Sequence, residues 1–243
     1  MEIVVHRGAH DVAPENTLAS ARACVDLGAD YVEIDVWRSV DGEHYIMHDP
    51  TLNRTTNGSG PIALRTSRYI DRLDAGSWFS PEFAGERVPR LEAFLDWARG
   101  RIKIYLDVKA GSLRRIVRMI REHGMEGHVF FWFPFDRGAR RFRTLAPDIP
   151  LKMNSRTPED VRRHKALFDH QIVEQGPNEA TPAVAAVCRE LGIRMMANVF
   201  GKSAANEAEL HALYRRVVES DYDMVNLDRP GPFVAFLRAE GLR

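Results

Sequence analysis

The segment Tyr31–Asp49, YVEIDVWRSVDGEHYIMHD, predicts a buried strand, a short hairpin and a returning segment that ends on His48. Side chains two positions apart on a strand share a face, so Glu33 and Asp35 point the same way. Two carboxylates about 7 Å apart on one strand face repel each other and lose solvation, so we expect a cation between them. A divalent metal is the simplest candidate, and a solvated acidic face on an amphipathic strand is the alternative.

Strand-like and helix-like segments alternate along all 243 residues, which is the pattern of parallel α/β architecture. The expected strands are Ile3–His6, Tyr31–Val36, Ile102–Val108, His128–Phe133, Leu151–Met153, Gln171–Glu174, Arg194–Val199 and Met224–Leu227. The expected helices are Asn16–Leu27, Leu91–Ala98, Ser112–His123, Asp136–Leu145, Pro158–His164, Pro182–Leu191, Ala204–Glu219 and Pro232–Ala239. Eight such units in about 250 residues predict an α/β fold of the (β/α)8 TIM barrel type, as one domain over residues 1–243.

One interval, approximately residues 49–90, is too long for an ordinary loop between a strand and a helix. Long insertions on the catalytic face of a barrel commonly shape the substrate pocket. The interval contains apolar residues such as Ile62, Trp78 and Phe79, which can pack together. We therefore expect a small ordered insertion after the second strand rather than a disordered loop.

Composition argues against several classes of protein. Lys plus Arg equals Asp plus Glu at 34 each, so no basic field indicates a nucleic-acid partner. The two cysteines, Cys24 and Cys188, lie far apart in helix-like segments and favour packing roles in a reducing compartment. The apolar run before His6 is too short for a signal peptide, and no run approaches membrane-spanning length. We expect a cytoplasmic protein without stable membrane insertion, and the oligomeric state stays open.

Polar residues cluster where the predicted strands end, and those ends form the active-site face of a TIM barrel. The cluster comprises His6, Arg7, Glu33, Asp35, Asp107, Lys109, Glu174 and Asp228, with His48 at the end of the hairpin. Three of the carboxylates suit a hard cation, two histidines suit proton transfer and two cations suit an anion, which together indicate phosphoryl transfer. Oxygen ligands without cysteine favour Mg²⁺ or Ca²⁺ over Zn²⁺. The sequence has no nucleotide-binding phosphate loop and no Gly-Xaa-Ser-Xaa-Gly elbow.

An ordered series of motifs carries a family resemblance. Its dense part is His6-Arg7-Gly8, Pro14-Glu15-Asn16-Thr17, Glu33-Ile34-Asp35-Val36, His48-Asp49, Leu52, Arg54-Thr55-Thr56 and Gly58. Its thinner part is Val88-Pro89-Arg90-Leu91, Leu106-Asp107-Val108-Lys109 and Asn226-Leu227-Asp228-Arg229-Pro230. The series resembles the glycerophosphodiester phosphodiesterases, within the phosphatidylinositol phospholipase C-like phosphodiesterase superfamily. One HRG motif would be weak evidence, but the ordered series spans nearly the whole chain.

The resemblance implies a barrel that hydrolyses a small-molecule phosphodiester, namely a glycerophosphodiester, to an alcohol and glycerol 3-phosphate with one divalent metal ion, Mg²⁺ or Ca²⁺. The residues it implies fall into four groups. They are Glu33, Asp35 and Asp107 for the metal, His6 and His48 for catalysis, Arg7 and Lys109 for the substrate, and Glu15 as an acidic residue near the metal. From strand position alone, Glu174 is a further accessory candidate, and an exposed strand-end acid is its alternative reading.

Two positions depart from the family's pattern. Asp107 stands where the family more often has glutamate, so direct ligation and ligation through a bridging water both remain open. The segment Met195–Val199 lacks the tryptophan that the family often places beside the substrate, which bears on substrate choice. We assign His6 as the general base and His48 as the general acid, although sequence order does not fix on which side of the phosphate each lies.

Other readings of the same residues remain. One alternative is a sugar-phosphate or lipid phosphodiesterase that acts through a cyclic phosphate, and another is a non-catalytic barrel that binds phosphodiesters. Polar residues in the insertion, such as Ser59 and Ser67, argue against a lipid substrate. The pair His6 and His48 argues against a pure binder, which needs no two titratable imidazoles. The alcohol half of the substrate and the physiological metal stay open.

Overall fold

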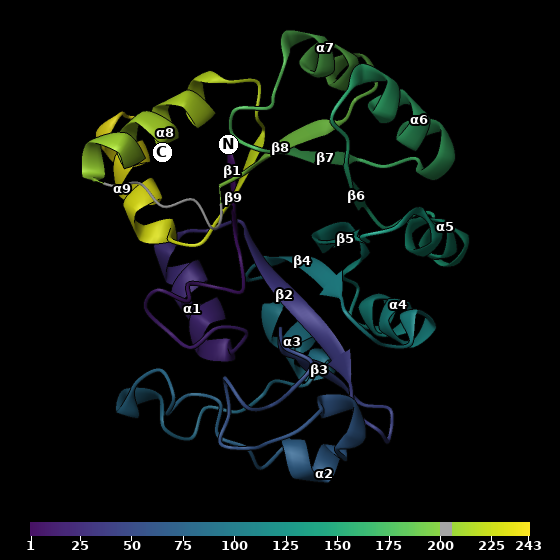
Figure 1. Ribbon diagram of the computed structural model, residues 1–243, viewed down its shortest axis with the longest axis vertical. Coiled ribbons are helices and arrows are strands. Elements are labelled where there is room, and N and C mark those ends of the chain that lie inside the picture. Colours follow the sequence, from purple (N-terminus) through teal and green to yellow (C-terminus); the bar gives the residue numbers. More distant parts are fainter. Residues whose placement is uncertain (200–205) are drawn as a thin grey trace.

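Eight parallel strands close into a barrel in the computed structural model, which describes residues 1–199 and 206–243. The strands are β1 (Glu2–Val5), β2 (Tyr31–Arg38), β4 (Lys103–Val108), β5 (Val129–Trp132), β6 (Leu151–Asn154), β7 (Ile172–Gln175), β8 (Arg194–Asn198) and β9 (Met224–Leu227). Each pairs with the next, β9 pairs with β1, and β1 pairs with β2, which closes the ring shown in Figure 1. The predicted (β/α)8 TIM barrel is confirmed.

Helices surround the ring on the outside (Figure 1). They are α1 (Leu18–Leu27), α3 (Leu91–Ala98), α4 (Leu113–Glu122), α5 (Asp136–Leu145), α6 (Pro158–Phe168), α7 (Pro182–Glu190), α8 (Glu207–Glu219) and α9 (Pro230–Ala239). Several begin where a short polar side chain accepts a hydrogen bond from a first-turn N–H group, as Thr157 and Thr181 do before Pro158 and Pro182.

The predicted boundaries of these elements are close to those in the structure. The largest error is in α6, which continues past the predicted end at His164 to Phe168, and the apolar Phe168 packs into the core. The predicted helix Ala204–Glu219 begins in residues that lie outside the described part of the chain. Within residues 1–199 and 206–243, no helix combines the length and the apolar character needed to cross a membrane. Both cysteines, Cys24 and Cys188, are buried free thiols, as expected for packing residues.

The alternation along β2 separates two layers of the molecule. Val32, Ile34 and Val36 join the large apolar core between the strands and the helices. Tyr31 belongs instead to a second cluster inside the barrel. This cluster, here called the barrel plug, consists of Val4, Tyr31, Tyr105, Phe130, Ile172, Met196 and Met224, with Trp132 packed against it. Because side chains on one face of a strand follow each other at every second position, polar residues above the plug project into the barrel mouth.

The predicted hairpin after β2 is present. Strand β3 (His44–Ile46) pairs antiparallel with β2, with Ile46 opposite Val36. Three short helices follow, η1 (Ile62–Leu64), α2 (Ser67–Ile70) and η2 (Pro81–Phe83).

The segment that carries these short helices packs around a small apolar cluster of its own, made of Tyr45, Met47, Leu52, Ile62, Ile70, Leu73, Ala75 and Val88. Trp78 was expected to pack inside this segment. It is instead 40% exposed and contacts Phe79 at the edge of the segment. That residues 49–90 act as an insertion that shapes a substrate pocket stays a prediction.

Candidate active site

A cavity of about 320 Å³ opens at the carboxyl ends of the barrel strands. Its lining residues are His6, Arg7, Glu33, Asp35, His48, Tyr105, Asp107, Lys109, Trp132, Lys152, Asn154, Glu174, Asn198 and Asn226. The structure therefore brings together every candidate residue from the sequence except Glu15 and Asp228. The lining also contains residues that the sequence analysis did not propose, and Lys152 and Asn226 are the most deeply buried of these.

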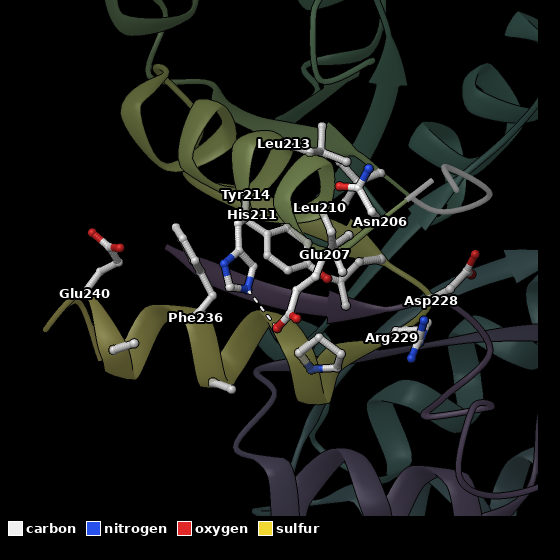
Figure 2. Close-up of a pocket in the computed structure, with 15 residues that line it drawn as sticks. Asn206, Glu207, Leu210, His211, Leu213, Tyr214, Asp228, Arg229, Phe236 and Glu240 are labelled. Carbon is white, nitrogen blue, oxygen red and sulfur yellow. Dashed lines mark ion pairs between the residues drawn. The ribbon is translucent and has the colours of Figure 1, made fainter. Parts of the chain in front are cut away.

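A larger cavity of about 870 Å³ lies between α8 and α9 and is shown in Figure 2. Its wall is mostly apolar, with Leu210, Leu213 and Phe236 among its residues, and Asp228 and Arg229 stand at one end. Its charged residues include the pair Glu207 and His211, and it contains no complete group of three metal-binding side chains among the described residues. We therefore place the candidate chemistry in the smaller cavity at the barrel mouth, where charged groups converge.

Three buried carboxylates form one side of the smaller cavity. Glu33 and Asp35 project from β2, and Asp107 is the register partner of Asp35 on β4. One oxygen from each lies within 4.8 Å of the others. Burial raises the pKa of Glu33 well above its usual value, and the charges of Asp35 and Asp107 raise it further. Burial also raises the pKa of Asp107. This crowding of oxygen donors fits a hard divalent cation.

Two polar side chains hold these carboxylates in place. Lys109 Nζ lies 3.0 Å from Asp35 Oδ1 and 2.6 Å from Asp107 Oδ2. Burial alone would lower the pKa of Lys109, but Asp35 and Asp107 together raise it. Asn16 donates from Nδ2 to Asp35 Oδ2 at 2.9 Å and accepts from the Asp35 N–H at 3.1 Å. The sequence analysis quoted Asn16 within a motif but gave it no role, and the structure shows that it fixes the orientation of Asp35.

Arg7 contributes from a strained backbone position at the end of β1. Its φ of +57° lies in the left-handed region, and its N–H donates to Glu33 Oε2 at 2.8 Å. The guanidinium Nε is 3.8 Å from Asp35 Oδ2, which is too long for a hydrogen bond. This buried Nε has no hydrogen-bond partner among the described residues. Arg7 therefore presents an unused donor at the edge of the cavity.

Glu15 lies outside the cavity, behind Arg7. It accepts two hydrogen bonds from Arg54, at 2.7 and 2.8 Å, and one from Arg7 at 3.4 Å. Although burial favours its neutral form, the two arginines lower the pKa of Glu15 overall. In this arrangement Glu15 positions the arginine side chains.

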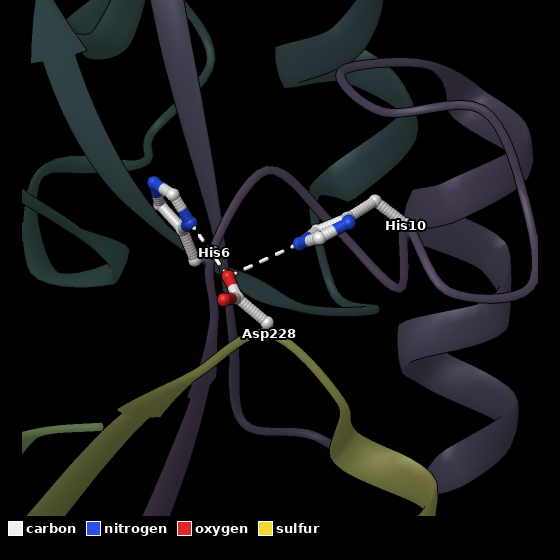
Figure 3. Close-up of side chains that lie close together, drawn as sticks. All are labelled: His6, His10 and Asp228. Atoms are coloured by element: carbon white, nitrogen blue, oxygen red, sulfur yellow. Dashed lines mark hydrogen bonds and ion pairs between the residues drawn. The ribbon is translucent and has the colours of Figure 1, made fainter. Parts of the chain in front are cut away.

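His6 shares a carboxylate with a second histidine (Figure 3). His6 Nδ1 lies 2.8 Å from Asp228 Oδ1, and His10 Nε2 lies 3.1 Å from the same oxygen. Figure 3 shows the two rings approaching Asp228 from different sides. The hydrogen bond that Asp228 accepts from His10 raises the pKa of His10. No motif in the sequence pointed to His10, because only the closure of the barrel between β1 and β9 brings it to Asp228.

His48 has an equivalent carboxylate partner. Its Nδ1 lies 2.9 Å from Asp49 Oδ1, and its carbonyl oxygen accepts a hydrogen bond from Trp37 at 2.9 Å. Arg54 donates to both oxygens of Asp49 and holds the pKa of that carboxyl well below its usual range. Because an ionised carboxylate only accepts hydrogen bonds, Asp49 places the proton of a neutral His48 on Nδ1. Nε2 is then the ring nitrogen of His48 without a proton, and Asp228 lies at Nδ1 of His6 in a similar position.

The side of the cavity on β6 and β7 carries a buried ion pair. Lys152 Nζ lies 2.9 Å from Glu174 Oε2, and the ammonium group sits over the rings of Tyr105 and Trp132 at 4.8 and 5.0 Å. Glu174 is only 8% exposed, so the reading of this residue as an exposed strand-end acid is wrong. The sequence could not identify Lys152, because a lone lysine on a strand is usually solvated.

Changing His10 to glutamine should lower the stability of the protein in acid and have little effect in alkali. The pKa of His10 is raised above 6.5 in the folded chain, chiefly by the hydrogen bond to Asp228. Its charged form therefore contributes stability below about pH 6.5, and that contribution is lost as the pH rises through the raised pKa. Urea unfolding of the wild type and His10→Gln at pH 5.5 and pH 9 would measure the difference. His128→Gln, at an exposed histidine, is the control. An equal loss at both pH values would contradict a charged His10 beside Asp228.

Comparisons with known proteins agree with this geometry. The model of the glycerophosphoryl diester phosphodiesterase family matches residues 6–126. The crystal structure of a glycerophosphodiester phosphodiesterase from Agrobacterium tumefaciens strain C58 is 36% identical, with a TM-score of 0.87, over 97% of this chain and 99% of that one.

Two curated glycerophosphodiester phosphodiesterases are also similar. The protein of Caldanaerobacter subterraneus subsp. tengcongensis is 27% identical over 94% of this chain and 98% of its own length. The protein of Bacillus subtilis strain 168 is 34% identical over 51% of this chain, and the match spans 47% of that protein. The chain therefore belongs to the glycerophosphoryl diester phosphodiesterase family, an enzyme family of phosphoric diester hydrolases.

Proposed function

We propose that the chain hydrolyses glycerophosphodiesters to an alcohol and glycerol 3-phosphate, with one divalent metal ion and two catalytic histidines. One observation carries the proposal. The convergence of Glu33, Asp35 and Asp107 occurs in the same cavity that receives His6 and His48. A phosphodiester needs both kinds of group, because charge on the phosphoryl oxygens must be neutralised while two protons move.

Glu33, Asp35 and Asp107 would hold the metal, and their oxygen donors favour Mg²⁺ or Ca²⁺. When bound, the ion supplies positive charge that polarises the phosphoryl group. Lys109 and the unused Nε of Arg7 would bind the remaining phosphoryl oxygens.

The two histidines would divide the proton transfers. His6 Nε2 takes the proton of the attacking hydroxyl group, which belongs to water or to the neighbouring carbon of the substrate, while Asp228 holds Nδ1. His48 Nε2 donates a proton to the leaving alcohol oxygen, while Asp49 holds its Nδ1. A new P–O bond forms as the P–O bond to the alcohol breaks. If the substrate's own hydroxyl attacks, water must then open the cyclic phosphate to give glycerol 3-phosphate. Two imidazoles that are each oriented by a carboxylate favour catalysis over simple binding.

The small polar cavity favours a water-soluble diester as the substrate. Sugar-phosphate diesters and lipid diesters are the alternative substrates that the assays would detect. We further propose a cytoplasmic location, because Cys24 and Cys188 are both buried free thiols. The partner we propose is the small-molecule substrate alone, without nucleic acid.

Product analysis tests the proposed reaction. Glycerophosphocholine should yield choline and glycerol 3-phosphate, which ³¹P NMR separates from the diester. Incubation with glycerol 3-phosphate alone should release no inorganic phosphate at a comparable rate, because the site is proposed to bind a phosphate between two substituents. Rapid release of inorganic phosphate from the monoester would replace the diesterase assignment with a phosphatase.

Metal removal should abolish turnover, and Mg²⁺ or Ca²⁺ should restore it, because the charge of three buried carboxylates exceeds that of Lys109. Asp35→Asn should raise the metal concentration needed for half-maximal activity. Asp107→Glu should be tolerated, since it restores the length usual in the family. Chelator saturated with the same ion is the control. Full activity in thoroughly metal-stripped protein would contradict the proposal.

The two histidines should respond differently to the leaving group. General acid catalysis typically contributes about 10²–10⁴-fold, and a nitrophenolate needs little of it. His48→Ala should therefore cripple hydrolysis of an alkyl diester and largely spare a nitrophenyl diester, whereas His6→Ala should damage both. Steady-state kcat/KM for each variant and substrate gives the comparison, with the exposed His128→Ala as control. The opposite pattern would exchange the two roles, and equal losses throughout would refute a division of work.

A further inference from the structure

The wall of the cavity that faces the three carboxylates is polar but carries no net charge. It consists of Lys152 on β6, Glu174 on β7, Asn198 on β8 and Asn226 on β9, here called the polar belt. Around the closed ring, β7 lies four strands from β2, and β8 lies four strands from β4. Glu174 and Asn198 therefore stand across the barrel mouth from the proposed metal ligands, and Lys152 and Asn226 flank them.

The members of the belt are held by one another. Lys152 pairs with Glu174, as described above, and Asn198 donates from Nδ2 to Glu174 Oε1 at 3.3 Å. Glu174 Oε2 has an ionic contact with Lys152 but accepts no hydrogen bond from the described residues, although it is buried. Asn226 is the register neighbour of Asn198 on the adjacent strand. The belt is thus held in a fixed arrangement, and some of its donor and acceptor atoms still lack hydrogen-bond partners among the described residues.

Asn226 has the largest unused capacity in the belt. Its side chain is 1% exposed and lines the cavity, yet neither Nδ2 nor Oδ1 has a hydrogen-bond partner in the described part of the chain. Below it on the same strand face is Met224 of the barrel plug, which offers no hydrogen bond. Buried amides are almost always hydrogen-bonded in proteins. A molecule that enters the cavity is the remaining source of partners.

The chemistry of the belt selects among ligands. An anion would face Glu174 and leave the Asn226 carbonyl oxygen without a donor. A cation would face Lys152 and leave the Asn226 amide group without an acceptor. A hydroxyl group both donates and accepts, so neighbouring hydroxyl groups can satisfy both atoms of Asn226 and the spare oxygen of Glu174.

We propose that Asn226, Asn198 and Glu174 form a subsite for hydroxyl groups that binds the free end of the glycerol half of the substrate. This inference rests on the proposed function and adds specificity-determining residues to it. The belt lies directly above the barrel plug, so only the end of a substrate reaches it, and the variable alcohol remains at the mouth. The subsite selects diesters with an unsubstituted glycerol, because a missing or acylated terminal hydroxyl leaves Asn226 unpaired. Lys152 acts as a positioning residue through Glu174.

The test compares two substrates that differ in one hydroxyl group. The first is glycerophosphocholine, and the second is its analogue without the hydroxyl farthest from the phosphate, which keeps the hydroxyl on the neighbouring carbon. The wild type should prefer glycerophosphocholine by about tenfold or more in kcat/KM, because a site built to bind a hydroxyl discriminates against its absence. Asn226→Leu should reduce this preference to near unity while it retains turnover of the analogue.

A control variant separates specificity from general damage to the barrel. Met224→Leu changes the shape of the plug just below Asn226 without removing a polar group, and it should keep the wild-type preference. Thermal unfolding of each variant checks that it folds, and Asn226→Ser serves as the second variant if the leucine form does not. A wild type without the preference, or an Asn226 variant that retains it, would overturn the subsite while the diesterase assignment stands. Failure of the wild type to hydrolyse either diester would instead refute the proposed function.

Discussion

The mutual repulsion of Glu33, Asp35 and Asp107 is the constraint on which the rest of the barrel mouth depends. These carboxylates are buried on the inner face of β2 and β4, so the chain must stabilise them locally. It does so with the backbone N–H of Arg7, the amide of Asn16 and the ammonium of Lys109. The left-handed backbone at Arg7 and Asn16 is the local strain that places two of these donors.

A second set of charges lies around that centre and orients the two histidines. Asp228 holds His6 as well as His10, and Asp49 holds His48. Arg54 links Asp49 to Glu15, which also holds Arg7. His48, which is proposed to move a proton, and Arg7, which is proposed to bind phosphate, are thus parts of one connected network. A change at Arg54, outside the cavity, would disturb both, because it removes a partner of the partly buried carboxylates Glu15 and Asp49.

The cavity has two sides of different electrostatic character above an apolar floor. The side on β2 and β4 is acidic and suits a cation, and the polar belt on β6 to β9 is neutral and suits hydroxyl groups. The rings of Tyr105 and Trp132 hold the Lys152 ammonium group at the boundary between the floor and the belt. This division assigns the reacting phosphate and the recognised end of a substrate to different walls.

The local sequence pattern determined the strands and helices of this protein, and closure of the barrel determined which side chains meet in the site. The alternation in Tyr31–Val36 placed Glu33 and Asp35 on one face, and the eightfold rhythm of strands and helices predicted the barrel, because periodicity is a local property. The partnership of His10 with Asp228 was not predictable, since 218 residues separate the two side chains and only the pairing of β1 with β9 brings them together. For Lys152 and Asn226 the sequence shows the residue type, but burial and missing partners are properties of packing. Tertiary structure alone decided that these two residues face the cavity and that Glu15 lies behind it.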